Sequence, residues 1–205
     1  MDVGTLEGKI VVVTGGGSGM GAAFSRRLAA DGAHVVVNDV NEAAAGSVAD
    51  EVSGEAAIFD VADSKSFDAA IDRIVAHHGR IDVLINNAGI QHVAPIDEFP
   101  IEKWDAIIAI NMSSAFHTTA AALPMMRKAG WGRVINIASA HGLRASPFKS
   151  AYVTAKHGVV GMTKVIGLET AKEPITANAI STLFKVRLQL LAPAMPMHRS
   201  PITPR

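Results

Sequence analysis

The sequence predicts an α/β fold built on one doubly wound parallel sheet. Short runs of β-branched and other apolar residues alternate with longer stretches of helical spacing. The runs are apolar throughout, as in strands that helices cover on both faces. The 205 residues show no internal repeat or interdomain linker and suffice for one compact domain. Right-handed crossovers then give a doubly wound order, with ligands at the carboxyl ends of the strands.

The N-terminal part of the chain predicts two strands joined by a turn and a helix. Lys9–Val13 (KIVVV) is a β-branched run and predicts a buried strand. Gly15–Gly21 follows as a glycine-rich turn. Met20–Asp31 has helical spacing and ends before Gly32, a residue type common just past a helix end. His34–Asn38 (HVVVN) predicts the second strand.

The same alternation continues along the chain. Asn41–Val52 is alanine-rich, which favours a helix. Ala56–Phe59 predicts a short third strand. Ser64 is a good N-cap for a helix that runs to about His78. Ile81–Ile85 (IDVLI) predicts the fourth strand.

Two longer helices and two strands complete the predicted sheet. Glu102–Lys128 has helical spacing over its whole length, and Arg133–Ala138 (RVINIA) predicts the fifth strand. Tyr152–Lys172 predicts another helix, and Ile175–Ile180 a short sixth strand. The predicted domain therefore extends to residue 180.

Composition and charge exclude several classes of function. The 19 basic and 19 acidic residues balance, so charge gives no reason to expect nucleic acid or an anionic membrane as partner. The absence of cysteine excludes disulfides and thiolate sites, and we predict no metal site. No secretory signal is visible, and no apolar run approaches the roughly 18–20 residues of a membrane helix. We therefore expect a soluble cytoplasmic protein.

The C-terminal segment Ser181–Arg205 differs from the rest of the chain. It contains no Asp, Glu or Gly and holds four of the nine prolines. Proline disfavours a regular helix or a central strand. The sequence thus divides into a domain at residues 1–180, which carries the predicted site, and an atypical proline-rich tail at residues 181–205.

The glycine-rich turn after the first strand indicates a dinucleotide-binding site. Missing side chains let a pyrophosphate approach the backbone, and the next helix supplies N–H donors and the positive end of its dipole. The turn lacks the G-K-[ST] ending of a triphosphate-binding loop. An ordinary tight turn is the alternative. The predicted cofactor-binding residues here are Thr14, Gly15, Gly17, Ser18, Gly19, Met20 and Gly21.

Polar and small residues follow the next three strands, at the end of the sheet where ligands bind. Asp39 can accept hydrogen bonds from a ribose diol and would repel a 2′-phosphate, which favours NAD over NADP. Asp60 and Val61 follow the third strand and can contact adenine. A solvated carboxylate and a helix cap are the alternatives for the two acids. After the fourth strand, the predicted ribose contacts are Asn87, Ala88 and Gly89.

A tyrosine and a lysine carry the predicted chemistry. Tyr152 and Lys156 are four residues apart and so share one face of a helix. A nearby ammonium favours the phenolate, which makes Tyr152 a candidate general base for alcohol oxidation, or acid for ketone reduction. Ser139 ends the fifth strand and can hold the reacting oxygen. Asn111, in the long helix, can anchor a water leading from Lys156 to solvent. An ordinary surface pair is the alternative for tyrosine and lysine.

These motifs, in this order and spacing, resemble the short-chain dehydrogenase/reductase family. The resemblance rests on Thr14-Gly15-x-x-x-Gly19-x-Gly21, Asn86-Asn87-Ala88-Gly89, Asn111, Ser139 and Tyr152-x-x-x-Lys156, and covers roughly Leu6 to Ile180. It implies a Rossmann-like fold, a nicotinamide cofactor and a homo-oligomer. It also implies a catalytic tetrad of Asn111, Ser139, Tyr152 and Lys156.

The part from Asn86 to Ile180 more specifically resembles the bacterial D-3-hydroxybutyrate dehydrogenases. This resemblance implies that Gln91, His141 and Lys149 hold the substrate carboxylate, beside Ser139 and Tyr152. One cation and two hydrogen-bond donors would orient a small hydroxy acid. The implied reaction of ketone body metabolism is the NAD-dependent interconversion of (R)-3-hydroxybutyrate and acetoacetate.

The resemblance stops at Ser181, where the family continues with a substrate-covering lid and a last strand. We therefore expect both to be missing and turnover to be weak. Two other functions stay open. One is a 3-oxoacyl-thioester reductase of the same family, which Asp39 disfavours. The other is a catalytically silent NAD-binding fragment.

Overall fold

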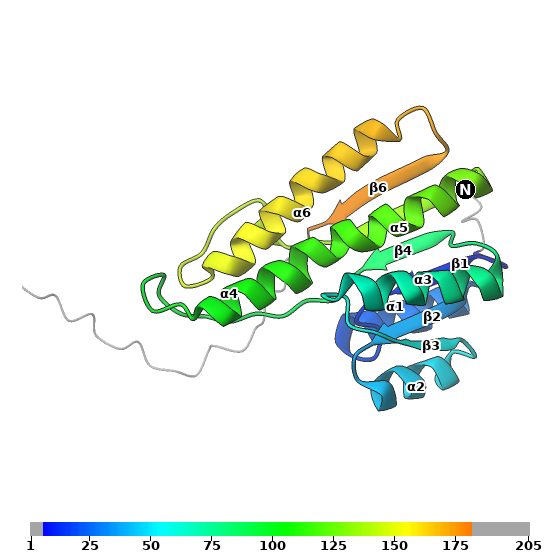
Figure 1. The fold of residues 1–205 in the computed structure, drawn as a ribbon, viewed down its shortest axis with the longest axis horizontal. Helices are drawn as coiled ribbons and strands as arrows, with labels where there is room; N and C mark the ends of the chain where they lie inside the picture. Colours follow the sequence, from blue (N-terminus) through cyan, green and yellow to red (C-terminus); the bar gives the residue numbers. More distant parts are fainter. Residues whose placement is uncertain (1–5, 182–205) are drawn as a thin grey trace, which may run out of the picture.

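A computed structural model of the protein describes residues 6–181 and contains one parallel sheet (Figure 1). The six strands lie in the order β3-β2-β1-β4-β5-β6, so the predicted doubly wound fold is confirmed. Each strand matches a predicted run to within two residues. The strands are β1 (Ile10–Val13), β2 (His34–Asp39), β3 (Glu55–Ile58), β4 (Val83–Asn86), β5 (Gly132–Ile137) and β6 (Ile175–Ile180).

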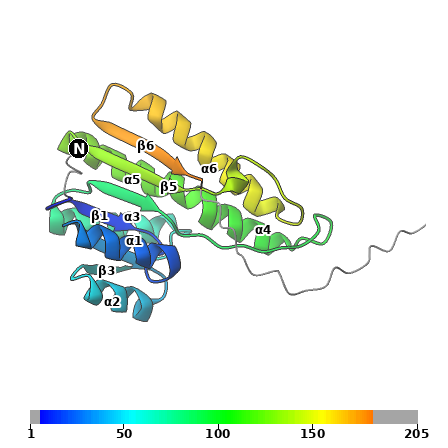
Figure 2. The ribbon, with the colours of Figure 1, turned by 180° about the vertical axis from the view of Figure 1, so that it is seen from behind.

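Helices connect the strands and form two outer layers. They are α1 (Gly19–Ala30), α2 (Glu42–Glu51), α3 (Ser64–His78), α4 (Ile101–Ile108), α5 (Ser114–Ala129) and α6 (Ser150–Glu169). A π-helical turn, η1 (Ala109–Ser113), joins α4 to α5, and a 3₁₀ turn, η2 (Ala140–Gly142), follows β5. Figures 1 and 2 show α3 and α5 on one side of the sheet and α1 on the other.

Two apolar cores lie on the two faces of the sheet, because successive strand residues point to opposite faces. On one face, Val12 and Val36 pack with Phe67 of α3 and Met126 of α5. On the other face, the neighbouring strand residues pack against α1 and α2. These include Val11, Val13, Val35, Val37, Ala22, Ala45 and Val48. Burial on both faces explains the continuously apolar strands in the sequence.

The second face is less covered at its β5–β6 end. There Ile135, Ile137 and Ile180 line an apolar groove beside Phe24 and Leu28 of α1. Within residues 6–181, β6 is the outermost strand on its side of the sheet. The predicted tail at residues 181–205 lies, apart from its first residue, outside the described part of the chain.

Three predicted helix features need correction. Asp63, and not Ser64, caps α3, since its carboxylate accepts a hydrogen bond from the Lys65 amide at 3.1 Å. The helix expected at 102–128 is continuous over Ile101–Ala129, but within it the turn η1 shifts the backbone to π-helical hydrogen bonding. Helix α6 ends at Glu169 instead of continuing to residue 172, and a turn follows it.

The continuous helical segment Ile101–Ala129 is 29 residues long and is apolar enough to cross a membrane by length and composition alone. Polar residues between Asn111 and Thr119 divide it, so the segment holds no uninterrupted apolar run of roughly 18–20 residues. In this fold the segment packs on the sheet through Ala122, Leu123 and Met126, and 44% of its most apolar window is buried. We therefore interpret it as a core helix.

Candidate active site

A cleft runs along the carboxyl ends of the strands, where the sheet order reverses between β1 and β4. One part, of about 380 Å³, lies beside the glycine-rich turn. A second part, of about 510 Å³, lies beside β5 and α6. The two parts share the wall residues Met20, Asn87, Gly89 and Ile90, so the cleft is continuous. Doubly wound sheets bind ligands at this position.

The first part of the cleft contains most of the residues predicted to hold the cofactor. Thr14, Gly17 and Gly21 lie behind its wall and shape the turn. The Thr14 hydroxyl oxygen accepts hydrogen bonds from the amides of Asn87 and Ala88 at 3.0 and 3.1 Å, which joins the turn after β1 to the loop after β4. The predicted residues that line this part are Gly15, Ser18, Gly19, Met20, Asp39, Asp60, Val61, Asn87, Ala88 and Gly89.

The turn itself requires glycine at specific positions. Gly15 and Gly19 have φ angles of +62° and +52°, which other residues rarely adopt. A Cβ at Gly15 would lie 3.0 Å from the Ala88 Cα, and one at Gly21 would collide with the carbonyl oxygen of Gly15. Ser18 caps α1 without a side-chain hydrogen bond. The first amides of α1 therefore remain available to an anionic ligand.

Two carboxylates lie at the far end of this part. Asp39 accepts hydrogen bonds at 3.1 Å from the amides of Gly17 and Asn41, one on each carboxylate oxygen. The negative charge is thus fixed beside the glycine-rich turn. Asp60 accepts a hydrogen bond from the Ala62 amide at 2.8 Å, which orients it in the loop after β3.

The second part of the cleft contains the tyrosine and the lysine. The Lys156 ammonium donates a hydrogen bond to the carbonyl oxygen of Ile137 at 2.7 Å and lies 5.6 Å from the centre of the Tyr152 ring. The Lys156 side chain is almost completely buried, and this burial lowers the pKa of Lys156 to about 8. Ser139 also lines this part, at the end of β5.

Gln91, His141 and Lys149 line the same part, although Gln91 comes from the loop after β4 and the other two come from the segment between β5 and α6. One ring nitrogen of His141 lies 2.8 Å from the Ser146 hydroxyl and the other lies 3.3 Å from the Ser139 hydroxyl. The ring packs edge-on against Tyr152 at 5.9 Å. Burial, and to a lesser extent the charge of Lys149, lower the pKa of His141. The lowered pKa favours the neutral imidazole of His141.

Asn111 lies within the long helical segment, as the sequence predicted. It lies in the π-helical turn and lines neither part of the cleft. Its side chain accepts a hydrogen bond from the Ile90 amide at 2.8 Å and donates one to the Ile90 carbonyl at 2.9 Å. Asn111 therefore holds the loop that separates the two parts of the cleft. A water relay from Lys156 through Asn111 stays a prediction.

Comparison with known proteins agrees with this geometry. The family model of short chain dehydrogenases matches residues 9–184. The chain belongs to the short-chain dehydrogenase family. It is therefore an oxidoreductase that acts on a small molecule, and dehydrogenases of this family use nicotinamide cofactors.

The relatives of this short-chain dehydrogenase include enzymes named for two substrates. It is 49% identical over 180 residues to D-beta-hydroxybutyrate dehydrogenase of Cupriavidus necator, covering 85% of this chain and 70% of that protein. Identity to the protein of the same name in Rhizobium meliloti is 48%, covering 84% and 69%. It is also 34% identical to a 3-oxoacyl-acyl-carrier-protein reductase of Thermotoga maritima, covering 87% and 75%.

The residues of the dehydrogenase cleft fit a nicotinamide dinucleotide. The close approach of Gly15 and Gly21 to the neighbouring backbone leaves a cradle that side chains would fill. The free amides of α1 suit a pyrophosphate, and the Asp39 carboxylate suits a ribose diol. The cleft then continues to Ser139 and Tyr152, which suits a nicotinamide at that end.

Four residues that shape the site were not predicted from the sequence, namely Thr118, Asn136, Ser146 and Thr163. Behind the cleft, Asn86 donates to the Asn136 carbonyl at 2.8 Å, and Asn136 donates to the Thr163 hydroxyl at 2.8 Å. Thr118 donates to Asn86 at 2.6 Å, so this buried chain joins β4, β5, α5 and α6. A polar residue inside an apolar strand is a visible signal for Asn136. Nothing local in the sequence indicates Ser146, the partner of His141.

Proposed function

We propose that this dehydrogenase interconverts (R)-3-hydroxybutyrate and acetoacetate with NAD. The observation that carries the proposal is that Gln91, His141 and Lys149 line the same part of the cleft as Tyr152 and its lysine. The names of the two relatives with 49% and 48% identity support the same substrate. A cytoplasmic homo-oligomer is the setting that the family resemblance implies for this ketone-body reaction.

The carboxylate of the substrate would be held by charge and by hydrogen bonds. Lys149 supplies the positive charge, and charge-assisted hydrogen bonds to a carboxylate are stronger than neutral ones. The neutral His141 ring and the Gln91 amide supply further donors. These three contacts at one end of a small molecule would direct its carbinol carbon toward Tyr152 and Ser139.

The chain's own residues would manage the proton. In the oxidation direction, the Tyr152 phenolate takes the proton of the substrate hydroxyl, while Ser139 donates a hydrogen bond to the same oxygen. The Lys156 ammonium lies one helical turn from Tyr152, 5.6 Å from the centre of its ring. When bound, the nicotinamide supplies the acceptor for the hydride of the carbinol carbon. Tyr152 returns the proton in the reduction direction.

Asp39 supports NAD as the cofactor. Both of its oxygens are held by backbone amides, so the carboxylate cannot turn away easily from the cleft. A 2′-phosphate there would add negative charge beside a fixed negative charge. At a separation of about 4 Å, such repulsion amounts to roughly 1–4 kcal/mol near a protein surface.

Steady-state kinetics with each enantiomer test the proposal. We expect NAD reduction with (R)-3-hydroxybutyrate and little with the (S)-enantiomer. Lys149→Met should raise KM by about 100-fold with a smaller change in kcat, because it removes a charged contact of about 2–3 kcal/mol. Lys164→Met, an exposed lysine on α6, is the matched control and should leave KM unchanged.

A specific result would replace the proposal with the related reductase. Reduction of 3-oxoacyl thioesters with NADPH, without turnover of (R)-3-hydroxybutyrate, would assign the substrate class of the Thermotoga maritima relative. Binding of NADH without any turnover would assign the catalytically silent alternative.

A further inference from the structure

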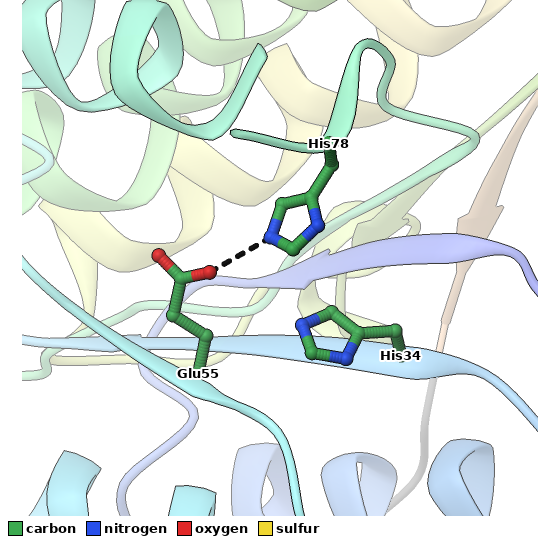
Figure 3. Close-up of side chains that lie close together, drawn as sticks. All are labelled: His34, Glu55 and His78. Atoms are coloured by element: carbon green, nitrogen blue, oxygen red, sulfur yellow. Dashed lines mark hydrogen bonds and ion pairs between the residues drawn. The ribbon is translucent and has the colours of Figure 1, made fainter. Parts of the chain in front are cut away.

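Three potential metal ligands meet at the end of the sheet opposite the cleft (Figure 3). His34 is the first residue of β2, Glu55 is the first residue of β3, and His78 is the last residue of α3. One ligand atom from each side chain lies within 4.8 Å of the other two. None of the three lines either part of the cleft, so this cluster is separate from the candidate active site.

The register of the sheet explains why these side chains converge. Val36 of β2 pairs with Glu55 of β3, and His34 lies two residues before Val36 on the same face. That face is covered by α3, because Val36 and Ile74 belong to one core cluster. His78 follows Ile74 by one helical turn, which brings its side chain over the same strands.

Hydrogen bonds within the cluster pair only some of its polar atoms. His78 Nε2 lies 2.7 Å from Oε2 of Glu55 (Figure 3). His34 Nε2 is buried and, among residues 6–181, has no hydrogen-bond partner. Its ring centre lies 4.7 Å from that of His78. Leaving a buried polar atom unpaired costs free energy, so we interpret His34 Nε2 as a candidate metal ligand.

We propose that His34, Glu55 and His78 together bind one Zn²⁺ ion. Two imidazoles and a carboxylate are a common zinc ligand set, with bonds of about 2.0–2.2 Å and a water in the fourth position. In a tetrahedral site the ligand atoms lie about 3.4 Å apart. The ligand atoms lie within 4.8 Å of one another, so the widest pair would close by at most about 1.4 Å, and the His78–Glu55 pair, now at 2.7 Å, would open by about 0.7 Å.

Two further features of the position suit a cation. The carbonyl end of the 15-residue helix α3 lies at His78, and the negative end of a helix dipole favours positive charge. The Glu55 side chain is 34% exposed and that of His78 is 12% exposed, so an ion can enter from solvent and keep one water. The three residues are far apart in the chain, so no local spacing in the sequence indicates this metal site.

The site would fasten the edge of the sheet. β3 is the outermost strand on its side, and the ion would tie it to β2 and to the end of α3. Because the site lies at the opposite end of the sheet from the cleft, Zn²⁺ should raise the melting temperature without changing cofactor affinity. An ion that binds only the folded state stabilises it in proportion to its occupancy.

His77 offers a competing explanation that the experiment must separate. Its Nδ1 lies 3.5 Å from the same Glu55 oxygen, and its ring stacks on His78, but its side chain is 71% exposed. A loose surface site would use His77 and His78 and would not need the buried His34.

The experiment titrates the chelator-treated protein with Zn²⁺ by calorimetry and records the thermal shift. Co²⁺ substitution adds the visible absorption of a tetrahedral site. We expect one ion per chain. His34→Gln and His78→Gln should each weaken binding by at least 100-fold and abolish the thermal shift, whereas His77→Gln and the remote control His117→Gln should bind as the wild type does.

The His34 variant is the decisive one, since within the described part of the chain His34 Nε2 makes no hydrogen bond that the variant would lose. Circular dichroism and the unchanged affinity for NADH establish that each variant is folded. Zn²⁺ binding that survives His34→Gln but is lost in His77→Gln would overturn the proposal in favour of a surface site. Zn²⁺ binding to the wild type no tighter than to a His34→Gln/His78→Gln double variant would overturn it as well.

Discussion

Burial of Lys156 makes a quantitative prediction about the pH dependence of folding. The pKa of Lys156 is about 8 in the folded protein, against an ordinary value of 10.5. This difference corresponds to roughly 3 kcal/mol, because one pKa unit equals about 1.4 kcal/mol. The folded state holds the proton less tightly, so the unfolded chain binds more protons between about pH 8 and 10.5. Stability should therefore rise with pH across this window.

The Lys156→Met substitution removes this titration and isolates its contribution. The assay is urea unfolding at several pH values from 7 to 10, in a Tyr152→Phe background. Tyr152 is the chain's one tyrosine, so no phenol titrates in that background. We expect the stability of the Lys156 protein, relative to Lys156→Met, to increase by roughly 2–3 kcal/mol from pH 7 to 10. The difference at one pH also contains the lost hydrogen bond to Ile137, so the slope is the cleaner measure.

The matched control is Lys164→Met, which removes an exposed lysine two turns further along α6. Its unfolding free energy should differ from that of the background by the same amount at every pH. A stability difference for Lys156→Met that stays constant between pH 7 and 10 would refute the argument from burial. A difference that falls as the pH rises would have the wrong sign and refute it too.

Three further predictions follow from the described contacts. Thr163→Val should destabilise the fold by about 1–3 kcal/mol in urea unfolding, because it leaves the buried Asn136 amide unpaired, whereas exposed Thr154→Val should change little. Gly21→Ala should weaken NADH binding by at least about tenfold in a fluorescence titration, since the added Cβ collides with the backbone. The control Gly46→Ala places its Cβ in open space on α2, so this variant should bind NADH normally and gain about 0.5–1 kcal/mol of stability. Asp39→Asn should raise kcat/KM for NADPH relative to NADH by about tenfold or more, and an unchanged ratio would show that Asp39 does not select the cofactor.

The surroundings of Asn111 include features that local sequence patterns do not predict. Helical spacing predicted the long segment after β4 correctly, but it did not predict the π-helical turn at Asn111 or the hydrogen bonds of Asn111 to Ile90, 21 residues away. The N-cap of α3 is another such feature, since it is Asp63 and not the predicted Ser64. Both residues are acceptable caps, and only the path of the preceding chain decides which one accepts the helix amide.

Strand positions, the glycine-rich turn and the spacing of Tyr152 and Lys156 could be predicted because each depends on a repeating local requirement. An apolar run, a backbone that only glycine allows, and two side chains one helical turn apart are all visible within a few neighbouring residues. The sequence motifs alone therefore indicate the family and the position of the candidate cleft.

Packing alone brought together residues that no local pattern connects. The sheet register sets His34 beside Glu55 and His78. The buried chain of Thr118, Asn86, Asn136 and Thr163 forms only when two strands and two helices assemble. Such contacts depend on the crossing of distant elements, and their energies depend on burial. Neither these contacts nor their energies can be predicted from a short stretch of sequence. The lowered pKa of Lys156 and the histidine cluster were therefore found only in the tertiary structure.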